Sequence, residues 1–372
     1  MTLNTPSITT REALEILRAG WAAQSAGTMQ VAYMLHGRPG VGKTDIVRQL
    51  SDEIGARLFD LRLTTIEPQD LRGLPYFDHE ARRTIWYRPE DLPDDPNRPS
   101  ILFLDELTAA APALQPAVYG LLQERRVGPH HLPNSTFVIA AGNTAEDGAI
   151  AYEMGTALSD RLVHLHIAAS ATDWLENYAI PKGLHPTVVS FVKTRPDLLE
   201  TTPQALQTGE MIAATPRSWE RVSQILATNP SRRTRDVLIA GTVGAAVAGE
   251  FALLADEIAA NVHIEDLLAA APAKRWALYP STLHGLHAVA FGLIGALDET
   301  TLDPVVEVME GIRHLPTHRS DNAFSRIPLA ELCTYGFELL IRKALDKGLG
   351  EQVLANPAYQ SYARDREAAG LG

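Results

Sequence analysis

The feature that most restricts the fold is the segment GRPGVGKT, residues 37–44, which follows the apolar run QVAYMLHG. It fits the phosphate-loop pattern G-x-x-x-x-G-K-[S/T]. Glycines let backbone N–H groups approach phosphate oxygens closely, and the N-terminus of a following helix favours negative charge. A strand, this loop and a helix in that order predict an α/β core with a parallel sheet.

The phosphate loop also assigns roles to its residues. Lys43 can reach the β- and γ-phosphates of a nucleotide, and the hydroxyl of Thr44 can bind Mg²⁺. ATP and Mg²⁺ are therefore the expected cofactors. We expect nucleotide contacts from nine consecutive residues, namely Gly37, Arg38, Pro39, Gly40, Val41, Gly42, Lys43, Thr44 and Asp45.

Polar residues also end two later apolar runs. SILFLDEL (100–107) contains Asp105 and Glu106, and STFVIAAGN (135–143) ends in Asn143. An acidic residue can simply cap a strand, and Asn often ends strands by forming a turn. Downstream of a phosphate loop, Asp105 suits Mg²⁺, Glu106 suits activation of water, and Asn143 can bind that water or the γ-phosphate. A general base at this place favours hydrolysis over phosphoryl transfer to a substrate.

Two more runs complete the expected sheet, ARLFDLRL (56–63) and RLVHLHI (161–167). After the first, LPYFDHEARRTIWYRPEDLP (74–93) has two extended stretches around HEAR. It predicts a β-hairpin within an insert at about residues 64–92. Trp86 and Tyr87 in this hairpin either grip a partner polypeptide as an exposed aromatic tip or pack against the sheet.

Arg161 stands immediately before the last predicted strand, in ALSDRLVHLHI. Spacing alone leaves two interpretations open. The arginine is a surface charge or the partner of Asp160, or it is a finger that reaches the ATP of a neighbouring subunit.

The chain changes character after about residue 168. Segments such as TPRSWERVSQIL have helical spacing, and no strand pattern or repeat follows. We therefore expect three domains: an α/β nucleotide-binding core at 1–168, a helical lid at 169–258 and a helical C-terminal extension at 259–372.

The apolar stretch from Val237 to Leu254 imitates a membrane span, but it contains Glu250 and three glycines. A packed soluble helix is the preferred interpretation, because spans usually need about 20 strongly apolar residues. The N-terminus resembles no signal peptide, and Cys333 is a lone cysteine expected to be buried in a helix. These features predict a cytoplasmic protein without a membrane span.

The motifs taken together resemble an AAA+ ATPase, through GRPGVGKT, LFLDEL, AAGN and SDRL. LDELTAAAPALQPAVYGLLQERRVG and GNTAEDGAIAYEMGTALSDRLVHLHI resemble the MoxR branch more narrowly. DLRGLPYFD is similar to the helix-2 insert of that branch, and TPRSWERV to its sensor-2 segment. The likeness covers roughly residues 10–255, although AAGNT departs from the Ala-Thr-Gln-Asn-Pro run common in the family.

This resemblance implies a homo-oligomeric ring, commonly a hexamer, with ATP at subunit boundaries. It implies that Arg161 is the finger and Arg217 the sensor-2 residue. Arg125 and Arg126 are further interface candidates, unless they are solvated charges at a helix end. It also implies chaperone-like remodelling or activation of a client protein, which often carries a von Willebrand factor A domain.

Two other functions fit a phosphate loop. An AAA+ nucleic-acid motor or loader is the main alternative, but the net charge of −12 argues against binding nucleic acid through bulk charge. No recognisable helix-turn-helix or aromatic-basic strand favours it either. A metabolic P-loop kinase is the third possibility, although kinases usually act without a finger from a neighbouring subunit.

Overall fold

The computed structural model describes residues 4–144, 147, 156–319, 322–368 and 370. Contacts divide the chain into two compact units. One unit comprises residues 1–170 and 202–208, and the other comprises 171–201 and 209–372. The first boundary lies close to the expected end of the core. The expected lid and C-terminal extension fall in one unit, so the three-domain division stays a prediction.

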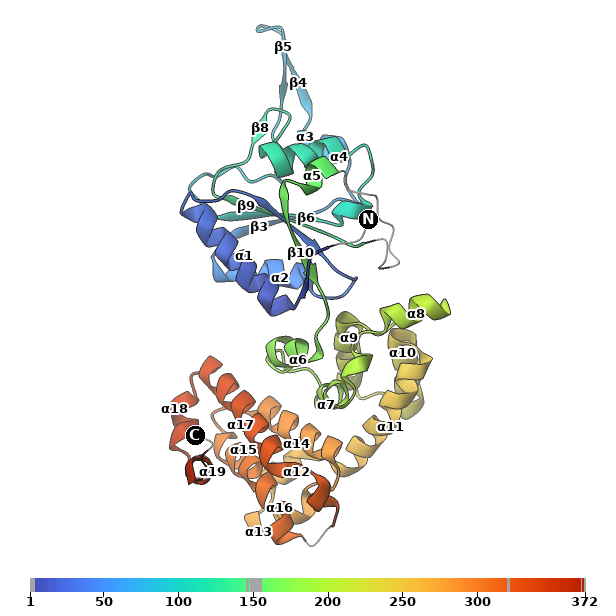
Figure 1. Ribbon diagram of the computed structural model, residues 1–372, viewed down its shortest axis with the longest axis vertical. Helices are drawn as coiled ribbons and strands as arrows, with labels where there is room; N and C mark the ends of the chain where they lie inside the picture. The colour runs from blue at the N-terminus through green and yellow to red at the C-terminus, as the bar shows by residue number, and fades with distance from the viewer. Residues whose placement is uncertain (1–3, 145–146, 148–155, 320–321, 369, 371–372) are drawn as a thin grey trace. The chain divides into compact units, whose positions relative to one another are not determined.

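The first unit is built on a six-stranded parallel sheet in the order β1-β10-β2-β9-β6-β3 (Figure 1). The strands are β1 (Ser7–Ile8), β2 (Ala32–His36), β3 (Arg57–Arg62), β6 (Ser100–Asp105), β9 (Thr136–Gly142) and β10 (Leu162–Ile167). The five predicted strands are confirmed. β1 was not predicted, because two residues are too few to show a pattern.

Alternating side chains of these strands enter two separate cores. On β2, Tyr33 and Leu35 face a cluster beneath α1 (Thr10–Ser25) and α2 (Lys43–Glu53), whereas Ala32 and Met34 face a second cluster. The second cluster lies on the face covered by α3 (Pro68–Arg72), α4 (Gln115–Tyr119) and α5 (Thr156–Ser159) (Figure 1). Burial on both faces explains why the strands are continuous apolar runs.

Several short elements complete this unit. They are the 3₁₀ turn η1 (Leu107–Ala109), the π-helical turn η2 (Gly120–Glu124), the small hairpin of β7 (Arg126–Val127) with β8 (His130–His131), and α8 (Thr202–Thr208). The predicted helix through PALQPAVYGLLQER is thus α4 continued by η2. It ends at Arg125, whose φ of 53° stops the helix.

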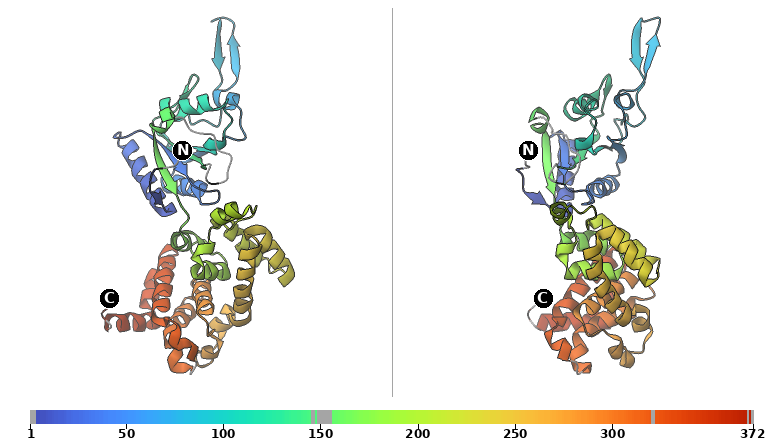
Figure 2. Two further views of the ribbon diagram at one scale, coloured as in Figure 1. Left: turned by 45° about the vertical axis from the view of Figure 1, so that its right-hand side comes forward. Right: turned by 90° about the vertical axis from the view of Figure 1, so that its right-hand side faces the viewer.

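The predicted β-hairpin is confirmed. β4 (Pro75–Asp78) pairs antiparallel with β5 (Arg83–Trp86), and the hairpin projects from the rest of its unit (Figures 1 and 2). Gly73 at its base has φ of +83°, and a Cβ there would lie 1.8 Å from the carbonyl oxygen of Tyr87. Only glycine fits this approach, so Gly73 fixes where the hairpin leaves the core.

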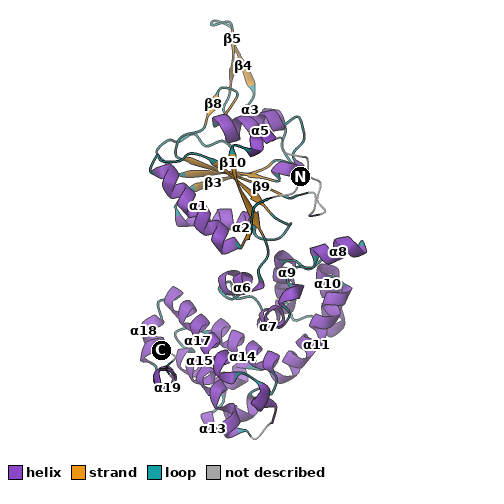
Figure 3. Cartoon of the chain, viewed as in Figure 1, coloured by secondary structure: helices purple, strands orange, loops and turns teal. Residues whose placement is uncertain are grey.

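Among its described residues, the second unit consists of helices joined by loops and turns (Figure 3). Its helices are α6 (Ala171–Trp174), continued by the π-helical turn Leu175–Ala179, α7 (Pro186–Thr194), α9 (Pro216–Ala227), α10 (Arg232–Val243), α11 (Ala245–Asn261), α12 (Ile264–Ala269), α13 (Pro272–Arg275), α14 (Leu283–Ala296), α15 (Leu302–Gly311), α16 (Leu315–His318), α17 (Leu329–Asp346), α18 (Gly350–Ala355) and α19 (Pro357–Ala368), with 3₁₀ turns at Pro196–Leu198, Trp276–Leu278, Ile312–His314 and Asn322–Arg326.

The sequence suggested a single helix over the apolar stretch 237–254, but the structure has two. Gly244 breaks it with φ of +90°, so α10 ends at Val243 and α11 begins at Ala245. None of the helices among the described residues is long and apolar enough to cross a membrane. Cys333 is fully buried in α17, as expected.

Candidate nucleotide-binding site

The phosphate loop connects the end of β2 to the start of α2. Gly40 and Gly42 have φ values of +83° and +110°, which side chains rarely tolerate. A Cβ on Gly37 would lie 2.5 Å from the carbonyl oxygen of Ile167, at the end of β10. All three glycines of the motif are therefore required by the backbone itself.

Lys43 is held at the centre of the loop by oxygen atoms. Its ammonium group donates to the carbonyl oxygens of Gly37 and Arg38, and it lies 2.9 Å from the Oδ1 atom of Asn143. These acceptors hold the charge where phosphate oxygens can replace them. Lys43 and Asn143 lie 100 residues apart in the chain, and the structure brings them together as predicted.

Thr44 and Asp105 lie side by side. The Thr44 hydroxyl donates to the Asp105 carboxylate over 3.4 Å, and the backbone N–H of Glu106 donates to that carboxylate over 2.9 Å. Burial raises the pKa of Asp105, although the Glu106 N–H opposes this. A buried carboxylate beside a hydroxyl fits a cation that keeps part of its water shell and binds phosphate oxygens, which is the usual environment of Mg²⁺.

Glu106 is held at the end of β3. Its carboxylate accepts a hydrogen bond from the hydroxyl of Thr64, and its Oε1 atom lies 3.7 Å from Nε of Arg62. The backbone of Glu106 is left-handed, with φ of 59°, which costs on the order of 1–3 kcal/mol in a residue other than glycine. A carboxylate that is held by defined contacts on a strained backbone is typical of a functional site.

Asn143 is fixed from the opposite side. Its backbone N–H donates to the Thr108 hydroxyl over 3.0 Å, and a Cβ on the preceding Gly142 would lie 2.7 Å from that side chain. Sequence reasoning missed Thr64 and Thr108. Thr64 follows the predicted strand 56–63 directly, which is the one signal that could have identified it.

Arg161 lies at the other edge of the sheet. It is exposed and directly precedes β10, whereas the phosphate loop packs against the end of that strand at Ile167. Six residues of extended chain span about 20 Å, which is beyond the reach of an arginine side chain. Residues 148–155 of the motif before Arg161 lie outside the described part of the chain.

The remaining predicted arginines differ in their contacts. Arg217 is exposed in the first turn of α9, in the second unit, and its role stays a prediction. Arg125 donates to the carbonyl oxygens of Pro133 (2.8 Å) and Thr136 (2.6 Å), and burial lowers its pKa. Arg126 forms an exposed ion pair with Glu124. Arg125 therefore holds the start of β9.

The aromatic residues of the hairpin match neither predicted alternative fully, because Trp86 packs on a side chain of α3 and Tyr87 lies at the base of the hairpin. Trp86 packs under the guanidinium of Arg72, 4.2 Å from its ring centre, whereas Tyr87 is 61% exposed and contacts the ring of Tyr76. Phe77 is 62% exposed as well. The turn of the hairpin is polar, so the exposed aromatic surface lies along its strands and base, not at its tip.

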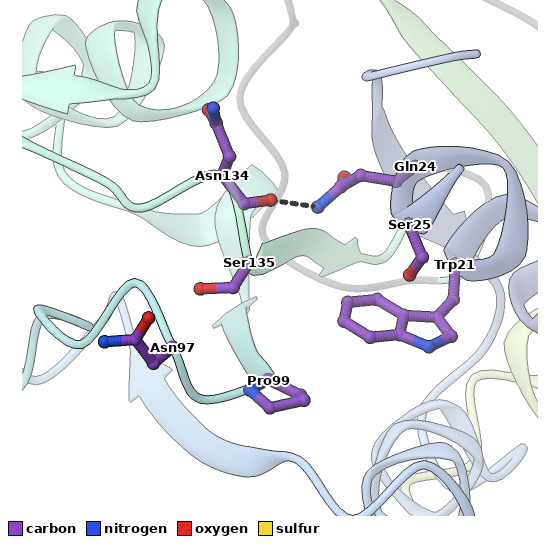
Figure 4. A pocket seen from close by; sticks show the side chains of 7 residues that line it. All are labelled: Trp21, Gln24, Ser25, Asn97, Pro99, Asn134 and Ser135. Atoms are coloured by element: carbon purple, nitrogen blue, oxygen red, sulfur yellow. Dashed lines mark hydrogen bonds between the residues drawn. The ribbon is translucent and has the colours of Figure 1, made fainter. Parts of the chain in front are cut away.

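Two surface hollows lie on the edge of the sheet where the strands begin. One, of about 340 Å³, is bounded by Trp21 and Asn134 (Figure 4). There the Gln24 side-chain amide donates to the carbonyl oxygens of Asn134 and Thr136, which is a structural contact. The other, of about 440 Å³, is lined by Arg161, Asp160 and Gln123. Arg161 thus borders a recess in the surface.

Residues 32–162 match the family model of the AAA domain, dynein-related subfamily. This segment includes β2 through the first residue of β10, and all the clustered polar residues described above. The match covers about a third of the chain, so this segment is similar to an AAA domain over the residues that form the phosphate loop and its neighbours.

Curated relatives are similar over part of this region. ATPase family gene 2 protein homolog B is 37% identical over 115 residues in Bos taurus and in Mus musculus. The matched segment is 31% of this chain, but only 12% and 13% of the two relatives' lengths. Protein SAV of Sulfolobus acidocaldarius is 38% identical over 80 residues, which are 21% of this chain and 9% of that protein.

Solved structures of Thermotoga maritima RuvB are similar at a lower level. The structure of the RuvB Holliday junction branch migration motor is 15% identical, with a TM-score of 0.35. The match covers 90% of this chain and 86% of the RuvB chain. A RuvB mutant is 14% identical over 78% of this chain and 86% of its own, with a TM-score of 0.38. Similarity at this level does not extend to activity or partners.

Proposed function

We propose that the AAA domain at residues 32–162 hydrolyses ATP within a ring of MoxR type, and that the ring remodels or activates a client protein in the cytoplasm. One observation carries the proposal. Lys43 contacts Asn143, and Glu106 directly follows β6, at the edge where the strands end, whereas Arg161 lies where they begin, about 20 Å away. A site completed by such an arginine needs a second subunit.

Within one subunit, the residues of the phosphate loop, Gly37 to Asp45, bind the triphosphate. Lys43 exchanges the carbonyl oxygens of Gly37 and Arg38 for phosphate oxygens, and its proximity to Asn143 supports a place for that amide beside the γ-phosphate. Thr44 and Asp105 hold Mg²⁺, which supplies positive charge against the β- and γ-phosphates when it is bound. The raised pKa of Asp105 supports this role, because a cation stabilises its ionised form.

Glu106 then acts as the general base for water. Its present hydrogen bond with Thr64 holds the carboxylate at the end of β3, so activation requires the side chain to leave Thr64. Asn143 orients the water, because its backbone is fixed by Thr108 while its side chain faces Lys43. These roles favour hydrolysis over transfer to another substrate.

Arg161 approaches the γ-phosphate of the neighbouring subunit and stabilises the charge that develops there. Its exposure, and the recess it borders with Gln123, support a place at a subunit interface. Arg217 acts as the sensor-2 residue, as the MoxR resemblance implies. Six subunits, the usual number in that branch, complete the ring.

The hairpin contacts the client. Tyr76, Phe77 and Tyr87 expose aromatic surface on an element that projects from its unit, and such patches mark protein-binding sites. The client expected from the MoxR resemblance carries a von Willebrand factor A domain. Phe77→Ser should weaken capture of such a client, whereas ATP hydrolysis without client stays unchanged.

Mixing two inactive variants tests the shared site. Glu106→Gln binds ATP and offers a normal Arg161, but its own hydrolysis should fall on the order of 100-fold or more. Arg161→Ala keeps its own loop and base, but offers no finger. Mixed rings place a normal Arg161 beside a normal Glu106, so phosphate release should rise well above that of either variant alone.

Mixing each variant with itself is the control, and the oligomer size is measured by mass photometry in every sample. Absence of rescue in mixed rings would contradict the shared site. Duplex or single-stranded DNA is then added to wild-type protein. Strong stimulation of hydrolysis by DNA would favour the nucleic-acid motor instead of a protein client.

A further inference from the structure

Two histidines connect the strand that enters the phosphate loop with the segment that carries Arg161. His36 is the last residue of β2 and is 5% exposed, and His164 lies on the neighbouring β10. Their rings stack with centres 5.1 Å apart, and Nε2 of His36 lies 2.8 Å from Nδ1 of His164. The phosphate-binding function assigned above does not use this pair.

The chain of contacts continues to the segment before Arg161. The Nε2 atom of His164 lies 2.9 Å from the carbonyl oxygen of Ser159 and 3.0 Å from its hydroxyl oxygen. Ser159 ends α5, and the backbone N–H of Arg161 donates to the carbonyl of Leu158 in the same turn. His164 therefore holds the turn from which the arginine side chain leaves.

The chemistry of Ser159 fixes the positions of the ring hydrogens. A carbonyl oxygen can only accept, so Nε2 of His164 carries a hydrogen and donates it. Neutral His164 then has a lone pair on Nδ1, to which Nε2–H of His36 donates. Both rings are thus in the Nε2–H form, and the hydrogen bond from His36 to Nδ1 of His164 favours the same tautomer that Ser159 requires.

His36 stays neutral near pH 7. Burial lowers the pKa of His36 to about 4, with His164, His166 and Lys43 acting in the same direction and Asp147 opposing them. The Nδ1 atom of His36 is buried and has no hydrogen-bond partner within the described ranges. A proton added to His36 would go to Nδ1, and a proton on Nδ1 of His164 would move the hydrogen of His36 to its Nδ1. In both cases the buried Nδ1–H of His36 would have no acceptor, so the arrangement described above is the favourable one.

The other end of the chain of contacts meets the nucleotide. Gly37 follows His36, packs against the carbonyl of Ile167, and accepts a hydrogen bond from Lys43. In the proposed function, phosphate oxygens replace that carbonyl as acceptors for Lys43. The turn before Arg161 is consequently held, through His164 and His36, by strand β2, which leads directly into the phosphate loop.

We propose that His164 is a positioning residue for Arg161, and that His36 orients it by donating to its Nδ1 atom. The proposal rests on the proposed function, because it takes Arg161 to act on the ATP of the next subunit. His164 touches neither nucleotide nor water. It acts by holding Ser159, so it matters only in the subunit that offers its arginine.

The mixed rings separate these roles, because each component has one task. Glu106→Gln subunits offer the finger, and Arg161→Ala subunits hydrolyse ATP. Two substitutions divide the contacts of His164: Asn retains an acceptor for His36 but cannot reach Ser159, and Gln retains a donor that reaches Ser159. His166→Asn, two residues along the same strand, is the matched control.

His164→Asn placed in the Glu106→Gln subunits should lower the rescued rate on the order of 100-fold, which is the cost of misplacing a catalytic group by about 1 Å. The same substitution in the Arg161→Ala subunits should leave the rescued rate within about twofold. His164→Gln and His166→Asn should stay within a few-fold of the parent mixture in either placement. Binding of a fluorescent ATP analogue and thermal unfolding are measured for each variant.

A purely structural role predicts equal loss in both placements, and that result would overturn the proposal. So would a harmless His164→Asn in the finger-offering subunits, or a His164→Gln as damaging there as His164→Asn. If the parent mixture itself shows no rescue, the shared site is wrong and the role of His164 falls with it. Should His164→Asn fail to fold, His164→Leu also removes the Ser159 contact and carries the same expectations.

Discussion

The two edges of the six-stranded sheet use their polar side chains differently. Where the strands end, Lys43 and Asn143 contact each other, as do Thr44 and Asp105, and Glu106 contacts Thr64. Where the strands begin, Arg125 and Gln24 donate to backbone carbonyls of residues 133–136. At the first edge, Lys43 and Thr44 can exchange their present acceptors for a ligand, whereas Arg125 and Gln24 hold the backbone at the start of β9. Arg161 also lies at the second edge, where its side chain is exposed.

The largest effect expected from this comparison follows Lys43→Ala. Phosphate oxygens lose their cation, so ATP binding should disappear and hydrolysis should fall on the order of 1000-fold. Arg48→Ala removes the same charge from an exposed position of the same helix and should leave the rate within about twofold. Titration with a fluorescent ATP analogue and phosphate release measure the two effects. Equal loss in both variants would mean that general charge, not the loop, binds the nucleotide.

Arg125→Met tests the other edge. The substitution keeps an unbranched side chain but removes the donor to the carbonyls of Pro133 and Thr136, so the free energy of unfolding should fall by about 1–3 kcal/mol. Denaturant unfolding measures this loss. The rate of hydrolysis per folded protein should change little if Arg125 only holds β9. A selective loss of hydrolysis at normal stability would instead place Arg125 at the subunit interface, as the sequence alone allowed.

Thr64→Ala examines the contact that restrains Glu106. Removing the hydroxyl frees the carboxylate for water, at a gain of about 1 kcal/mol, so hydrolysis should rise about fivefold. Thr65→Ala, which removes only a hydrogen bond to the carbonyl of Arg62, is the control. Steady-state phosphate release at saturating ATP decides the outcome. A fall to the rate of Glu106→Gln would show that Thr64 holds the base in its working position.

The difference between the edges also explains how far the sequence could be interpreted. The loop and the strand-end residues Asp105 and Asn143 were predictable, because parallel strands bring their ends together and polar residues interrupt apolar runs there. The strained backbone of Glu106 and its contact with Thr64 were not predictable, since they depend on how β3 and β6 pair. The role of Arg125 was ambiguous for a similar reason, because the carbonyl oxygens that it contacts belong to Pro133 and Thr136 in the next segment of the chain.

The helical unit offered less to sequence reasoning. Its helices follow from their apolar spacing, but Gly244 interrupts a stretch whose composition suggested one helix. Nothing in the local sequence distinguishes a glycine that ends a helix from Gly241 or Gly249, which lie inside helices. The buried ring cluster of Phe191, Trp219 and Phe251 joins three segments that only the fold brings together.

The smallest expected effect concerns pH and the carboxyl end of β2. The folded state lowers the pKa of His36 from 6.5 to about 4, so below pH 6.5 the unfolded chain binds more protons than the folded one. The stabilisation is complete above about pH 6.5 and is lost as the pH falls towards 4. Between pH 7 and pH 6 this loss amounts to less than about 1 kcal/mol.

His287 in α14 has a pKa lowered to about 4 as well, chiefly by burial, so the wild-type protein carries this dependence in both units. Burial also lowers the pKa of His130 in the first unit and of His185 in the second, so His36→Gln and His287→Leu should each reduce the pH dependence of their own unit without removing it. Calorimetry at pH 7 and pH 6 compares the variants with the wild type. Unchanged pH dependence in His36→Gln would contradict a neutral His36 in the folded state, and with it the arrangement of hydrogens through which His164 meets Ser159.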